Sequence, residues 1–198
     1  MKKYFKLLIV LLIVVSGCTT NSSHKPNTTY TIPLEQTTDE NYHWNYTITD
    51  SSIISVKEEK ANDEMSYLGN NCDFVVEGLK EGEASIYFEY IKDGDEEALY
   101  YYSITLKVND NLELEQVSES GDYVSLLKFL KLGEEKVGLE KSFKEYRFMF
   151  NDNVVNVGED ECDWLVVYED NEIIASYAIS NSNDHVYIND DGNRVLID

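Results

Sequence analysis

The chain has 198 residues, with 38 Asp and Glu against 16 Lys and Arg, and a formal net charge of −22. This acid excess excludes a nucleic-acid binder that depends on phosphate contacts, because such proteins need a basic face. The three cysteines are too few for a disulfide scaffold, so the fold must depend on an apolar core.

The N-terminal stretch has the parts of an export signal. Lysines precede an unbroken apolar run over residues 7–15, and Ser16 and Gly17 follow it. The run is shorter than the about 20 residues that a membrane-spanning helix needs. Residues 15–18, Val-Ser-Gly-Cys, also resemble a bacterial lipobox, in which the cysteine is acylated and becomes the new N-terminus. An uncleaved anchor and an ordinary secretory signal are the alternatives.

We therefore expect residues 1–17 to be a lipoprotein signal peptide, and Cys18 to carry lipid at the extracytoplasmic face of the cell membrane. Residues 18–29 are mostly small and polar, which is typical of a flexible tether. Cys72 and Cys162 would then remain. A bridge between them and two buried free thiols both stay open, because the sequence does not fix their distance.

From Tyr30 the apolar pattern has a period of two, which predicts half-buried strands. It is clearest over residues 84–91 and 99–108. The segment between these two runs contains Gly94, which can take a positive φ, and predicts a hairpin turn. Many short strands separated by turns predict an all-β sandwich over residues 30–110.

Residues 109–121 are acidic and polar, and we interpret them as a domain boundary. A helix is expected from Asp122 to about Leu132, with Ser120 or Asp122 as its N-cap and Gly133 at its end. Strand patterns then return over residues 146–150, 164–168, 173–179, 185–188 and 195–197. Residues 120–198 therefore predict a small α+β domain, in which one helix covers an antiparallel meander, and the whole chain is mainly β.

Four short motifs in the first domain support a family resemblance. They are Tyr42-His43-Trp44, Leu68-Gly69-Asn70-Asn71, Gly78-Leu79-Lys80-Glu81-Gly82 and Phe88-Glu89-Tyr90. Their types and spacing resemble the chagasin-type inhibitors of papain-like cysteine peptidases. The resemblance implies an immunoglobulin-like β-sandwich whose three loops at one end insert into a peptidase cleft. Such loops must be rigid, because a preorganised inhibitor avoids an ordering cost on binding.

The resemblance places the partner-binding loops at Thr37, Thr38, Asp39, Glu40, Asn41 and Tyr42, at Gly69, Asn70 and Asn71, and at Lys92, Asp93 and Gly94. The family's proline in the first loop and tryptophan in the third are absent here. Loss of such an aromatic anchor can cost about 2 kcal/mol at an interface. Asn41 is expected to replace a glycine at positive φ. Trp44 is expected to be a core residue, because it leads an alternating strand.

The second half is similar to small α+β modules of the PepSY-like kind. The similarity depends on a helix followed by hairpins, with residues 161–168 as the central strand. No functional residue is carried over from it.

No nucleophile elbow, zinc-protease helix, phosphate loop or dinucleotide fingerprint occurs in the sequence. His43 and Cys72 could lie on neighbouring strands, but no third group orients the histidine as a base. Acid clusters at residues 93–97 and 189–193 lack the ligand order of a calcium-binding EF-hand. We therefore expect no catalysis, no cofactor and no metal site.

The leading hypothesis is a monomeric, lipid-anchored surface protein that binds a protein partner through the three loops. The resemblance suggests a papain-like cysteine peptidase as that partner. The alternative is a non-inhibitory structural or sensory lipoprotein that binds another envelope protein or a cell-wall component.

Overall fold

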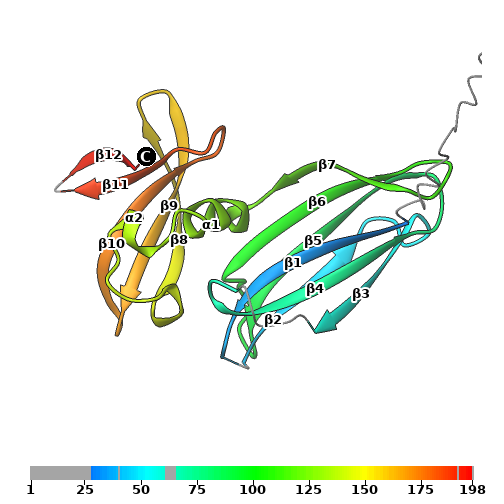
Figure 1. Cartoon of the computed structure of the whole chain (residues 1–198), viewed down its shortest axis with the longest axis horizontal. Coiled ribbons are helices and arrows are strands. Elements are labelled where there is room, and N and C mark those ends of the chain that lie inside the picture. Colours follow the sequence, from blue (N-terminus) through cyan, green and yellow to red (C-terminus); the bar gives the residue numbers. More distant parts are fainter. Residues whose placement is uncertain (1–27, 40, 61–65, 191, 198) are drawn as a thin grey trace, which may run out of the picture.

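The computed structural model describes residues 28–39, 41–60, 66–190 and 192–197 (Figure 1). The predicted signal peptide, Cys18, most of the tether and Glu40 lie outside these ranges. Thr29, which we assigned to the tether, already belongs to the first strand. In the described ranges, no helix has the length and apolar character needed to cross a membrane.

The first unit is a sandwich of two antiparallel sheets. Its strands are β1 (Thr29–Thr37), β2 (Tyr42–Ile48), β3 (Ile54–Lys60), β4 (Gly69–Gly78), β5 (Gly82–Lys92), β6 (Tyr100–Val108) and β7 (Leu114–Ser120). One sheet has the order β1-β4-β3 and the other β2-β5-β6-β7. These are the B-E-D and C-F-G orders of an immunoglobulin sandwich, with β7 added beside the last strand. The predicted mainly-β fold is confirmed.

The period-two pattern explains the core of this sandwich. Alternate residues of the β5–β6 hairpin are buried and face the other sheet, and Gly94 takes a φ of 88° in the turn. Trp44 is 5 % exposed, as expected for a core residue. Alternation places one set of side chains on one face, so burying that face supplies the apolar area that stabilises the fold.

The second unit is a meander covered by a helix. It contains α1 (Asp122–Leu130), α2 (Glu134–Val137), a 3₁₀ turn (Phe143–Glu145), β8 (Arg147–Val157), β9 (Asp160–Glu169), β10 (Glu172–Ser180), β11 (Val186–Asp190) and β12 (Asn193–Ile197). The sheet order is β12-β11-β10-β9-β8, so sequential strands are neighbours. The helix and hairpins therefore occur where their sequence patterns predict them.

The start of α1 differs from the sequence prediction. Gly121 occupies the N-cap position, and neither Ser120 nor Asp122 caps the helix with its side chain. The Asp122 carboxylate instead accepts a hydrogen bond of 2.6 Å from the Tyr101 backbone N–H. The carboxylate thus serves tertiary packing, which a local sequence pattern does not reveal.

The segment predicted as a domain boundary contains β7, which pairs with β6 from Ser103↔Ser120 to Val108↔Leu114. β7 leads directly into α1, and this helix lies between the sandwich and the second sheet (Figure 1). Tyr123, in the first turn of α1, is fully buried against Trp44 and Tyr102. One continuous apolar core therefore extends through both units.

The two cysteines of the described chain are both free and buried. Cys72 lies in β4 and Cys162 in β9, in different units. Of the two alternatives, the structure therefore has two buried free thiols and no bridge between them.

Candidate functional site

The segments that we predicted as binding loops meet at one end of the sandwich. β1 ends and β2 begins there, β4 begins there, and the β5–β6 hairpin turns there. We call this end the rim and define it as residues 37–39, 41–42, 69–71 and 92–94. In Figure 1 the rim is the end of the sandwich nearer to the second unit.

The first rim segment is held by its own polar groups. The Asp39 carboxylate accepts hydrogen bonds from the Asn41 backbone N–H, at 3.0 Å, and from its side-chain amide, at 2.6 Å. These bonds lower the pKa of Asp39 below its ordinary value. The turn is therefore fixed by an Asp side chain that bonds to the backbone two residues further on.

The second rim segment is a strand and not a loop. Gly69, Asn70 and Asn71 form the start of β4 and pair with residues 37, 36 and 35 of β1. Gly69 has a φ of 120°, and a Cβ atom there would lie 2.5 Å from the Thr38 Cγ2 atom. A glycine is therefore required where the first and second segments touch.

A buried carboxylate that the sequence analysis missed fixes the chain leading into this segment. Glu35 is buried, and its carboxylate accepts hydrogen bonds from the Ser66 hydroxyl and, at 3.0 Å, from the Leu68 backbone N–H. The Ser66 oxygen also accepts a bond from the Gly69 N–H. An acidic residue in an alternating strand resembles a solvent-exposed one, so its burial has no signal in the sequence.

Aromatic side chains form the floor under the rim. The Tyr90 hydroxyl accepts a hydrogen bond of 2.9 Å from the Thr37 N–H, and its ring stacks on Tyr42 at 5.5 Å. Burial raises the pKa of Tyr90. The Trp44 indole N–H donates to the Glu35 carbonyl at 3.1 Å, and the Tyr123 hydroxyl accepts from the Glu35 N–H. The backbone of Thr37 in the rim and of Glu35 just before it therefore has buried partners, which restricts its motion.

The third rim segment is joined to the first. The Asp93 N–H donates to the Asn41 carbonyl at 2.8 Å, and the Asp93 carboxylate lies 3.0 Å from the His43 ring. The Lys92 ammonium lies over the Tyr42 ring, 5.8 Å from its centre. Three segments that are distant in sequence thus form one connected surface.

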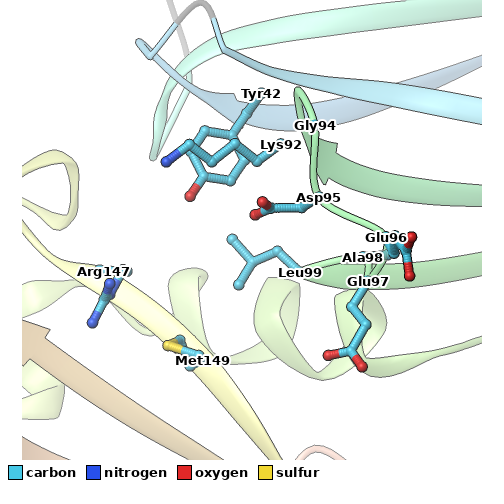
Figure 2. A pocket seen from close by; sticks show the side chains of 10 residues that line it. All are labelled: Tyr42, Lys92, Gly94, Asp95, Glu96, Glu97, Ala98, Leu99, Arg147 and Met149. Atoms are coloured by element: carbon cyan, nitrogen blue, oxygen red, sulfur yellow. The ribbon is translucent and has the colours of Figure 1, made fainter.

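A hollow of about 600 Å³ lies beside the third segment (Figure 2). Its lining consists of Tyr42, Lys92, Gly94, Asp95, Glu96, Glu97, Ala98, Leu99, Arg147 and Met149. Lys92, Tyr42 and Asp95 point toward the hollow from the sandwich, and Arg147 and Met149 face it from β8. Among the described residues, neither Lys92 nor Arg147 forms an ion pair. The sequence analysis missed Arg147 and Met149, because only tertiary packing brings β8 to the rim.

Cys72 and His43 are the two potentially catalytic side chains that directly follow rim residues in the sequence. Cys72 is buried, and burial followed by the nearby Glu58 raises the pKa of its thiol to about 12. His43 belongs to the opposite sheet and pairs with Asp93. A thiol with a raised pKa is a poor nucleophile. In the described part of the chain, no group of His, Cys, Asp and Glu side chains is arranged to hold a metal ion.

Comparisons with protein-family models, with curated proteins and with solved structures return no match for this chain.

Proposed function

We propose that this protein is a non-catalytic, lipid-anchored surface protein that recognises another protein through the rim. The proposal rests on one observation, which is that hydrogen bonds, ring stacking and the close contact at Gly69 connect the three rim segments to one another. A binding surface whose backbone is already ordered loses less entropy when a partner binds.

A papain-like cysteine peptidase is the partner class that the chagasin-type resemblance suggests. Tyr42 and Lys92 would be the main contacts, because they project from the rim where the family's aromatic anchor is absent. A partner that contacts Lys92 would also meet Arg147 and Met149 of β8 across the hollow. The recognised surface would therefore include both units.

The direction of β1 supports contact with a partner away from the anchor. β1 begins at Thr29 near the tether and ends at Thr37 in the rim. Eight residue steps of a strand extend about 26 Å. A rim at this distance from the tether would be presented outward from the membrane.

The second candidate function is binding of another envelope protein without inhibition of a peptidase. The hollow favours it, because both units contribute to its lining and a narrow peptidase cleft would have to accommodate β8 beside the rim. Under this function, Arg147 would matter to binding as much as Lys92.

The test is titration of papain and related cysteine peptidases with the soluble form that begins at Thr19. We expect stoichiometric loss of peptidase activity, and weaker inhibition by Tyr42→Ala and Lys92→Ala. Tyr101→Ala and Lys107→Ala are the matched controls, because both residues are exposed and lie outside the rim. Full peptidase activity at micromolar protein would reject inhibition and favour the second candidate. Equal losses in the controls and the rim variants would reject the rim as the site.

A further inference from the structure

The free edges of the sheets differ in how well they are protected. The edge strands are β1, β3, β2, β7, β8 and β12. Residues that discourage pairing occur in all of them except β2, namely Pro33 in β1, Lys57, Glu58 and Glu59 in β3, Glu115 and Glu119 in β7, Arg147 and Asp152 in β8, and Arg194 in β12. Charges and proline on an edge normally prevent another chain from pairing with it. β2, with the sequence YHWNYTI, lacks both.

The backbone of β2 alternates between paired and free residues. Hydrogen bonds from Asp93 to Asn41 and from Thr49 to Ser85 lie at the two ends of the β2–β5 pairing. They show that the odd-numbered residues of β2 are the ones that bond to β5. In an antiparallel ladder every second residue directs its N–H and C=O groups away from its partner. In β2 these residues are Trp44, Tyr46 and Ile48, whose backbone groups have no partner among the described residues.

The edge of β1 near the rim is different. There the N–H groups of Glu35 and Thr37 donate to the buried hydroxyls of Tyr123 and Tyr90. Side chains therefore close the β1 edge near the rim, whereas the β2 edge stays open. An open row of amides and carbonyls is a template for an added strand.

We propose that β2 binds an extended segment of a partner protein as an additional strand of the β2-β5-β6-β7 sheet. Variable-type immunoglobulin domains place an extra strand beside the equivalent strand, so the sandwich architecture accommodates one there. In this chain only Thr49–Ile53 connects β2 to β3, which is too short to supply such a strand. The position is thus available to another chain, and the open residues Trp44, Tyr46 and Ile48 lie outside the rim.

Side chains around β2 define the chemistry of the added segment. On the inner face it would lie beside Tyr46, which is 39 % exposed, and half-buried Ile48, so apolar side chains fit there. On the outer face it would lie beside uncharged Asn45 and Thr47, with Glu89 on the next strand. Since the whole chain carries −22, basic side chains fit on that face. The predicted occupant alternates apolar and basic residues.

A second copy of this chain fits the edge less well. Two copies would bring together two net charges of −22, which repel each other. A partner segment with basic side chains avoids this repulsion.

The test uses the full-length chain in mild detergent and the fluorescent peptide Lys-Val-Lys-Ile-Lys-Val-Lys as the probe. Fluorescence anisotropy measures binding, and hydrogen exchange with mass spectrometry measures protection of residues 42–48. The matched peptide carries N-methyl groups on alternate amides, which removes backbone donors and keeps the charge. We expect it to bind at least about tenfold more weakly, because several hydrogen bonds are lost.

The protein control compares Tyr46→Pro with Tyr46→Ala. Both remove the side chain, and only proline removes the outward N–H, at an edge position that tolerates it. Circular dichroism checks that both variants fold. We expect the proline variant to bind the probe at least about tenfold more weakly than the alanine variant.

Three results would overturn the proposal. These are equal binding of the two peptides, absence of binding at millimolar probe, and protection of residues 42–48 that depends on protein concentration alone. The last result would identify a second copy as the occupant. None of them depends on peptidase inhibition, so the outcome is separable from that of the rim.

Discussion

The hydroxyl of Tyr123 offers the sharpest test of how the two units are joined. Tyr123 belongs to α1, yet its hydroxyl accepts a hydrogen bond from the backbone N–H of Glu35 in β1. The substitution Tyr123→Phe removes this one atom and keeps the ring contacts with Trp44 and Tyr102. It therefore isolates the hydrogen bond between the helix and the sandwich.

The expected cost follows from the burial of the donor. Both Glu35 and Tyr123 are buried, so water does not replace the lost acceptor. An unsatisfied buried donor costs about 1 to 3 kcal/mol. For a chain of this size, each kcal/mol lowers the Tm by about 2 to 4 °C, so the expected decrease is roughly 2 to 12 °C.

Urea unfolding monitored by tryptophan fluorescence and by far-ultraviolet circular dichroism measures this cost. Because the core is continuous, both signals should show one coincident transition in the native protein and in the variant. Tyr101→Phe is the matched control, since Tyr101 is 49 % exposed and should change stability by less than about 0.5 kcal/mol. A loss for Tyr123→Phe no larger than that of the control would refute the reasoning.

Three further predictions follow from single residues. Gly69→Ala should destabilise the protein by about 1 to 3 kcal/mol in urea unfolding, because its φ of 120° strains an alanine; an unchanged midpoint would contradict this. The buried Cys72 and Cys162 thiols have raised pKa values, so iodoacetamide at pH 8 should label neither before unfolding, as intact mass would report. Rapid labelling of the native protein would contradict their burial. Burial raises the pKa of Asp122 to about 6, so its stability contribution is present below about pH 4 and lost as the pH rises through 6. Asp122→Asn should therefore gain about 3 kcal/mol more at pH 8 than at pH 4, and equal gains would be inconsistent with this pKa.

The continuous core changes how the two units can be studied. A fragment that begins at residue 120 would expose Tyr123 and separate Tyr100 from its hydrogen-bond acceptor, the Phe148 carbonyl, 2.9 Å away. Such a fragment would lose core packing together with any binding surface that the sandwich supplies. Substitutions in the intact chain are therefore the better way to compare the contributions of the two units to binding.

The sequence by itself determined most of the secondary structure. The alternation in β5 and β6, the turn at Gly94 and the helical spacing after Asp122 depend on residues close together in the chain, so their signals are local. The burial of Trp44 followed from the same reasoning. These patterns correctly predicted a β-sandwich followed by a helix and a meander.

Only the tertiary structure decided the positions of β7, Glu35 and Arg147 around the rim and the hollow. β7 was hidden in an acidic stretch, because its residues are mostly exposed and carry little alternation. Glu35 is buried through contacts with Ser66 and Leu68, and Arg147 reaches the hollow through β8. These placements depend on strand register and on the docking of α1, which join residues far apart in the chain. Burial and partner choice at such positions come from long-range packing, for which a local pattern has no signal.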